Sequence, residues 1–144
     1  MRDLMTDPRL VQRLEGAALL VAAAFAFDAG NWPWWLFLAL LLVVDLSMVG
    51  YLLGPSVGAA SYNLGHALIG PAALLAWWWA GGPNPSLALG AIWLAHIGMD
   101  RALGYGLKLR EGFEHTHLGA IGRLKKEAAY ASTSGPYTSG RRSR

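Results

Sequence analysis

The sequence predicts an all-α integral membrane protein, a bundle of four transmembrane helices with cytoplasmic N- and C-termini. Hydrophobic residues make up 54% of the 144 residues and charged residues only 15%, well below the roughly 25% of soluble domains. No Lys or Arg lies between Leu14 and Asp100. Gly, Pro and Asn clusters divide this stretch without basic residues at intervals close to the about 20 residues that a helix needs to cross a bilayer.

The first two predicted spans cover residues 12–27 and 33–53. The first is short and rich in alanine, and small residues let neighbouring helices approach closely in lipid. The second begins after a turn with Gly, Asn and Pro, and its single charged residue is Asp45.

The third predicted span covers residues 56–80, and Gly70–Pro71 should kink it because proline breaks the helical hydrogen bonding. The fourth covers residues 86–107. A cytoplasmic segment with a short surface helix over residues 121–129 is expected next, so that residues 1–130 form a single domain. The polar residues 131–144 should form a disordered tail.

The basic residues in the two tails predict that both termini are cytoplasmic, by the positive-inside rule. Two tryptophan clusters, residues 32–35 and 77–79, are typical of an aromatic belt near one interface. The net charge of +3 is therefore assigned to topology and to attraction to membrane lipids rather than to nucleic acid. The absence of cysteine excludes disulfides and thiolate metal sites.

The fourth span organises the functional hypothesis, since it carries ionisable residues inside a hydrophobic segment. Burying each such group costs at least ~2.5 kcal/mol on insertion scales, and such groups usually face a protein interior. His96 and Asp100 are four residues apart and share one helix face. Counted from the cytoplasmic ends of three spans, five polar residues fall at depths of about 10–16 Å, namely Asp45, Asn63, His66, His96 and Asp100. We expect them to converge in one layer.

Three interpretations of this layer remain open. It could be a polar lock, in which hydrogen bonds worth ~0.6 kcal/mol each hold the helices together. It could be a metal site, since Asp45, His66, His96 and Asp100 offer the imidazole and carboxylate ligands that Zn²⁺ or a similar divalent ion takes. It could also be a proton or ion relay.

An enzyme built on this site would need further residues. Arg101 and Lys108 would hold an anionic group at the cytoplasmic side, and His117 could shuttle a proton. Tyr62 and Tyr105, together with Asn63, would support the cluster as neighbouring polar residues.

Four motifs, Asp45–Pro55, Tyr62–His66, Trp93–Lys108 and Phe113–Gly119, resemble domain-of-unknown-function family 4260. The resemblance covers about Arg13 to Arg123. It implies a small multi-pass protein of the bacterial cytoplasmic membrane, with no established activity, substrate or cofactor. In the family pattern the position of His115 is often another polar residue, which favours His117 as the functional histidine of the pair.

Because the resemblance implies no activity, the functional hypotheses rest on the residues themselves, and whether the protein is an enzyme stays open. The first hypothesis is a membrane-embedded, metal-dependent hydrolase acting on a lipid or phosphorylated amphiphile. The second is a structural or accessory membrane protein whose polar layer only determines helix packing. A third is a small transporter, which would require a homo-oligomer because four helices without a repeat do not enclose a pathway.

Overall fold

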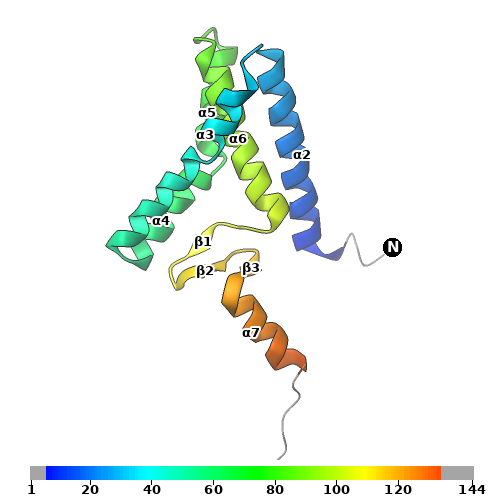
Figure 1. Ribbon diagram of the computed structural model, residues 1–144, viewed down its shortest axis with the longest axis vertical. Coiled ribbons are helices and arrows are strands. Elements are labelled where there is room, and N and C mark those ends of the chain that lie inside the picture. The colour runs from blue at the N-terminus through cyan, green and yellow to red at the C-terminus, as the bar shows by residue number, and fades with distance from the viewer. Residues whose placement is uncertain (1–5, 134–144) are drawn as a thin grey trace, which may run out of the picture.

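The computed structural model describes residues 6–133, most of which are helical (Figure 1). The α-helices are α2 (Pro8–Ala29), α3 (Trp34–Leu41), α4 (Pro55–His66), α5 (Ile69–Trp79), α6 (Pro85–Leu103) and α7 (Gly122–Thr133). A 3₁₀-helix, η1 (Val43–Leu53), follows α3, and three short strands, β1 (Lys108–Leu109), β2 (Gly112–Thr116) and β3 (Gly119–Ala120), follow α6. Of the predicted tail, residues 131–133 end α7 and the rest lies outside the described residues.

Helices α2 and α6 run antiparallel and pack along their lengths (Figure 1). Glycines allow this close approach, because a Cβ added at Gly98 would lie 2.6 Å from the backbone nitrogen of Leu20 and 2.8 Å from the carbonyl oxygen of Gly16. Towards the other end of the pair, Phe27 and Ala95 belong to the buried core. Helix α6 is thereby packed against α2 along one side.

The segment predicted as the third span is helical but broken. Helix α4 ends at His66 and α5 begins at Ile69, with Ala67 extended at φ −79° and ψ 142°. Pro71 explains the position of the break, since a proline cannot bond to the carbonyl four residues earlier and its ring clashes with it. That carbonyl belongs to Ala67, so the predicted kink is confirmed and is centred a few residues before Gly70–Pro71.

The predicted continuous α-helix over residues 33–53 is wrong in its second half, because α3 gives way to η1. Residues three apart align on a 3₁₀-helix, which places Ser47 and Gly50 on one face. That face packs against α4, where the Ser61 hydroxyl donates to the Ser47 carbonyl at 2.6 Å. A Cβ at Gly50 would lie 2.6 Å from the Ser61 Cβ. Close packing against α4 thus accompanies the tighter helix.

The all-α prediction also needs correction after α6, where the chain forms an antiparallel sheet of order β1-β2-β3. Lys108 pairs with Thr116, and His115 pairs with Ala120. Helix α6 ends at Leu103 because Gly104 takes a left-handed conformation, φ 92°, that glycine adopts readily. The surface helix predicted near residues 121–129 is confirmed as α7.

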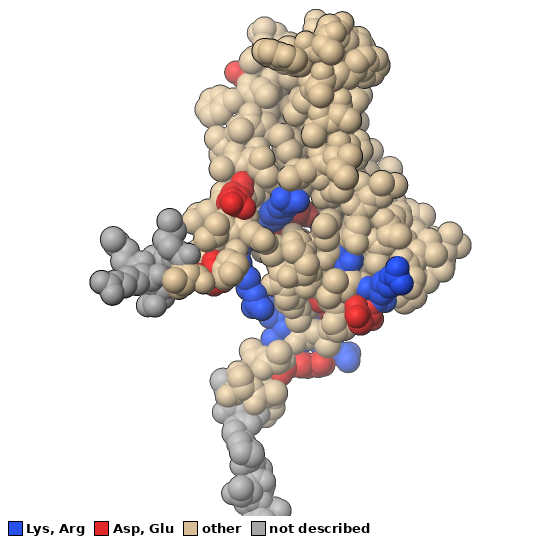
Figure 2. Space-filling view, turned by 180° about the vertical axis from the view of Figure 1, so that it is seen from behind, with Lys and Arg blue, Asp and Glu red and all other residues tan. Residues whose placement is uncertain are grey.

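Two helical segments, Pro8–Ala29 and Trp34–Leu53, are long and apolar enough to cross a membrane. Large apolar side chains are exposed on several helices, including Phe25 (72%), Leu64 (79%) and Trp79 (84%). Exposed apolar surface of this extent is typical of a face that contacts lipid or another protein. On the face drawn in Figure 2, Lys and Arg gather in the lower half, the end that carries the sheet and α7.

Candidate metal centre at the helix break

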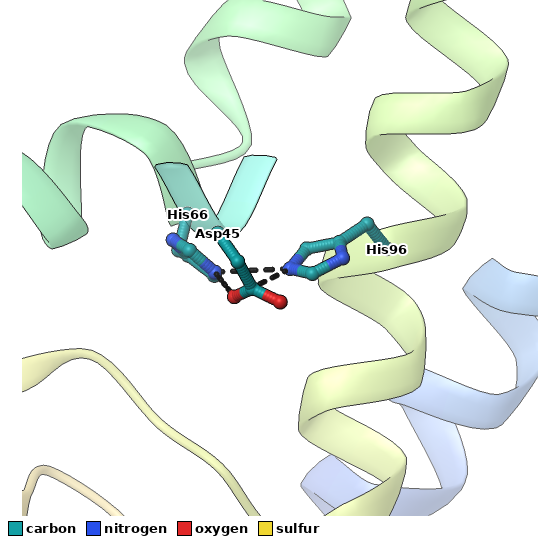
Figure 3. Close-up of side chains that lie close together, drawn as sticks. All are labelled: Asp45, His66 and His96. Carbon is teal, nitrogen blue, oxygen red and sulfur yellow. Dashed lines mark hydrogen bonds and ion pairs between the residues drawn. The ribbon is translucent and has the colours of Figure 1, made fainter. Parts of the chain in front are cut away.

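Three separate elements bring one acidic and two imidazole side chains together (Figure 3). Asp45 lies in the first turn of η1, His66 is the last residue of α4, and His96 lies within α6. The break at Ala67 ends α4 at His66. The side chains of His66 and His96 are 4% and 0% exposed, whereas that of Asp45 is 34% exposed. The cluster is therefore open on the Asp45 side.

The ligand atoms of this trio lie at distances suited to a shared cation. The Nε2 atoms of His66 and His96 are 3.0 Å apart, and Asp45 Oδ1 lies 3.7 Å from the first and 3.6 Å from the second. Zinc bonds of about 2.0–2.2 Å place the ligand atoms of a tetrahedral site about 3.3–3.6 Å apart. The observed separations bracket that range, so the trio fits one face of a tetrahedral site.

Asp100 supplies a second carboxylate beside the two histidines. Its Oδ2 lies 3.4 Å from His66 Nε2 and 3.9 Å from His96 Nε2. The same oxygen accepts a hydrogen bond from the Tyr62 hydroxyl at 2.8 Å. The Tyr62 ring stacks on His66 with centroids 3.7 Å apart, so one tyrosine orients both an acid and an imidazole.

The hydrogen bonding of His66 Nδ1 leaves a lone pair on Nε2, which lies within hydrogen-bond distance of His96 Nε2, at 3.0 Å. The Nδ1 atom of His66 lies 2.9 Å from the Tyr62 carbonyl oxygen. A carbonyl only accepts, which puts the proton on Nδ1 and a lone pair on Nε2. His96 differs, because its buried Nδ1 has no hydrogen-bond partner within residues 6–133.

Lys108 closes the cluster from the sheet side. Its Nζ lies 3.8 Å from the Phe113 ring centroid and 4.9 Å from that of Tyr62, within cation–π range. Burial lowers the pKa of the Lys108 ammonium below its usual value, while the Asp100 and Asp45 carboxylates act in the opposite direction. A cationic group therefore faces the two acids in a largely enclosed setting.

Asn63 holds the backbone of Lys108 in place. Its side-chain amide donates to the Lys108 carbonyl at 2.9 Å, and its Oδ1 accepts the Lys108 N–H at 2.7 Å. The asparagine thus pairs with β1 as a neighbouring strand would. A cavity of about 230 Å³ opens between these groups, lined by Asp45, Met48, Tyr62, Asp100, Tyr105, Lys108 and Phe113.

A family model described as "Domain of unknown function (DUF4260)" matches residues 9–121. The chain belongs to the DUF4260 family. No curated protein and no solved structure matches it. The matched region contains all of the groups described above, from Asp45 to Phe113. The family match therefore covers the candidate site, but the description of the family assigns it no function.

In this DUF4260 protein the structure brings together the four residues predicted as metal ligands: Asp45, His66, His96 and Asp100. Among the predicted supporting residues, Tyr62 and Asn63 contact this group as described, and the Tyr105 ring centroid lies 5.9 Å from Lys108 Nζ.

Two residues assigned catalytic roles, Arg101 and His117, do not line the cavity beside Lys108. Arg101 lines a smaller adjoining pocket with Tyr62 and Asp100. His117 is exposed, and its Nδ1 accepts the Leu107 N–H at 2.8 Å. His117 is thus engaged in supporting the backbone beside the sheet and does not line the cavity.

Sequence reasoning missed Phe113, which provides the nearest aromatic face for Lys108. The pairing of β1 with β2 brings the two together across the turn at Arg110 and Glu111. Strands of two and five residues are too short to display the alternation that predicts a sheet. The glycine at 112, with φ 147°, was the available signal for a turn here.

Proposed function

We propose that this protein crosses the membrane four times, with both termini on the cytoplasmic side. In Figure 1, α2, the α3–η1 segment, the α4–α5 segment and α6 pass alternately between the two ends of the molecule. Most of the exposed large apolar side chains lie along these segments. The basic residues lie at the end with the sheet (Figure 2), which supports a cytoplasmic location for that end.

We further propose that Asp45, His66 and His96 hold a divalent metal ion of the zinc type, and that Asp100 lies beside the ion outside its ligand set. The convergence of the three ligand atoms carries this proposal. Asp45 Oδ1 is 3.6–3.7 Å from both imidazole nitrogens, which is too long for a hydrogen bond. A purely hydrogen-bonded cluster gives that carboxylate no bond to either histidine, whereas a shared cation would bind all three atoms.

Charge balance favours the same interpretation. Two carboxylates approach two imidazoles whose side chains are almost completely buried. Buried charge is costly unless it is paired or coordinates a metal. A divalent ion would neutralise both acids at once and would leave Lys108 free to attract an anionic group.

The function that these groups support best is hydrolysis of a phosphorylated amphiphile. A divalent ion supplies Lewis acidity and activates water near neutral pH. Lys108 would hold the phosphate, and Asp100, oriented by Tyr62, would accept a proton from the attacking water. The water oxygen would add to phosphorus while the ester bond to the alcohol oxygen breaks, and Asp100 would return the proton it accepted to the departing alcohol oxygen. The aromatic rings of Phe113 and Tyr105 provide an apolar wall for the rest of an amphiphile.

The test is metal content followed by hydrolysis. Protein purified in detergent without chelator should contain about one divalent ion per chain, and His66→Ala and His96→Ala should each lose most of it, because two protein ligands rarely retain such an ion. His115→Ala and His117→Ala are the controls and should retain the ion. The loaded protein should release alcohol from phosphorylated amphiphiles, and His96→Ala should not.

A wild-type protein without stoichiometric metal, or variants of His66 and His96 that retain it, would overturn the metal site. Retained metal without hydrolysis of any phosphorylated amphiphile would overturn the enzymatic part alone.

A packing role is the second candidate, and the hydrogen bonds Tyr62–Asp100 and Asn63–Lys108 favour it because they tie α4 to α6 and to β1. Under this alternative the protein retains no metal. Paired apolar replacement of His66 and His96 would then leave the thermal unfolding temperature unchanged or raised.

A further inference from the structure

A second cavity, of about 210 Å³, lies where the start of α2, the end of α6, the sheet and α7 meet. Arg9 and Arg13 of α2 line it together with Lys125 of α7. Tyr105 lies beside them, and the remaining lining comes from the Gly104 turn and from the segment between Leu118 and Gly122. It is separate from the cavity at the candidate metal centre in all but Tyr105.

The charge of this cavity is unbalanced. Its lining contains three cations and no Asp or Glu. Arg13 uses its Nε to donate to the Ala102 carbonyl at 2.9 Å, capping the end of α6, and its two terminal nitrogens make no hydrogen bond to residues 6–133. No ion pair is formed by the side chains of Arg9, Arg13 or Lys125 within the described part of the chain. Three cations directed into one cavity repel one another unless an anion joins them.

The backbone near Arg9 leaves room for the Arg9 guanidinium, as expected of a site in which this group binds a ligand. The group lies against Gly119, where an added Cβ would be 3.2 Å from Arg9 Cζ and Nη2. The absence of a side chain at position 119 therefore lets the guanidinium approach the backbone of β3 closely. Planar guanidinium groups bind phosphate oxygens in pairs, which is why arginine is the usual phosphate-binding residue.

The location of the cavity narrows the range of ligands that it could bind. It lies at the end of the molecule where the basic residues gather (Figures 1 and 2), the end assigned above to the cytoplasmic interface. Helix α7 beside it is exposed and carries Arg123, Lys125 and Lys126. Anionic lipids attract such basic segments at the membrane surface.

We propose that this cavity binds a phosphate group, supplied by the headgroup of an anionic phospholipid or by free phosphate. Arg9 and Arg13 of α2 bind the phosphate oxygens, and Lys125 of α7 neutralises the phosphate charge. Binding joins α7 and the sheet to the transmembrane helices, because the three cations come from both sides of the cavity. The site does not depend on the metal centre and uses none of its ligands.

The test compares two variants of the full-length protein with equal loss of charge. Phosphatidylglycerol should bind the wild type at one per chain in detergent, measured by native mass spectrometry, and phosphatidylcholine should bind more weakly. The cavity variant Arg9→Gln/Lys125→Gln should bind phosphatidylglycerol about tenfold more weakly. The control Arg110→Gln/Lys126→Gln removes two exposed cations outside the cavity and should stay within about twofold of the wild type.

Inorganic phosphate distinguishes the two sources. If titration calorimetry detects phosphate at one per chain and phosphate displaces the lipid, the natural ligand is a soluble phosphate. If only the lipid binds, the ligand is a headgroup. Equal losses in the two variants, equal binding of both lipids, or no binding of either phosphatidylglycerol or phosphate would overturn the proposal. Arg13 stays unchanged in both variants because its bond to Ala102 supports the fold.

Discussion

At the scale of single residues, the site depends on side chains that position other groups. Tyr62 makes three contacts with two site residues, since its hydroxyl donates to Asp100, its ring stacks on His66 and its carbonyl accepts from His66 Nδ1. Asn63, the next residue, holds β1. Consecutive residues of one helix lie about 100° apart, so α4 uses two adjacent faces, one for the metal centre and one for the sheet.

Replacing Asn63 tests this second role. In Asn63→Ala the N–H and carbonyl of Lys108 lose their partner, and an unsatisfied buried group costs about 1–3 kcal/mol. We expect a lower thermal unfolding temperature and faster amide hydrogen exchange at Lys108. Asn84→Ala is the matched control, because Asn84 is exposed and its side chain makes no capping bond to α6. Equal exchange rates at Lys108 in the two variants would contradict the role given to Asn63.

At the scale of elements, glycines decide how closely the helices pack. Gly16 and Gly98 place the backbones of α2 and α6 in contact, and Gly50 does the same for η1 against α4. The first contact holds α6, which carries His96 and Asp100, and the second holds η1, which carries Asp45. Helix association in lipid relies on such small residues because the hydrophobic effect gives helices little reason to associate there.

The substitution Gly98→Ala should therefore loosen the α2–α6 pair. Its new methyl group would meet backbone atoms of Leu20 and Gly16, which cannot move as a side chain can, and overpacking of this kind costs about 1–3 kcal/mol. Gly90→Ala on the same helix meets only side-chain atoms of Leu74 and Leu75 and should cost less. Thermal unfolding in detergent compares them, and an equal or larger loss in Gly90→Ala would contradict the argument.

The elements were predictable from the sequence to different degrees. The break near Pro71 and the helix α7 follow from local rules for proline and for amphipathic segments. The 3₁₀ conformation of η1 was not predictable, because its apolar residues give no period that distinguishes the two helix types, and packing against α4 favours one. The sheet was missed because its strands are too short for alternation to show.

The candidate site was more predictable than the backbone around it. Polar residues inside apolar segments are costly unless they meet one another, so Asp45, His66, His96 and Asp100 could be grouped by depth alone. The contribution of Phe113 and the exclusion of His117 depended on the course of the sheet. Local sequence carried no information about that course.

At the scale of the whole molecule, the proposed orientation can be tested directly because the chain contains no cysteine. Asn84→Cys lies in the turn before α6, and Glu111→Cys lies in the turn between β1 and β2. In intact cells a membrane-impermeant maleimide should label the first and spare the second until the membrane is disrupted. The cysteine-free wild type is the background control. Labelling of Glu111→Cys in intact cells would contradict a cytoplasmic sheet.

The interruption between α4 and α5 has one more consequence, concerning the backbone groups that it releases. If the proposed topology holds, the break lies inside the bilayer, where no water is present to donate to a carbonyl that has lost its helical donor, so a neighbouring group must donate to it. The indole N–H of Trp93 donates to the Gly65 carbonyl, directly before the histidine at 66. The same turn that frees this oxygen also ends the helix at His66. The break between α4 and α5 thus provides a hydrogen-bond acceptor for Trp93 of α6. Pro71, which accounts for the break, therefore sets the positions of both the Gly65 carbonyl and the His66 imidazole.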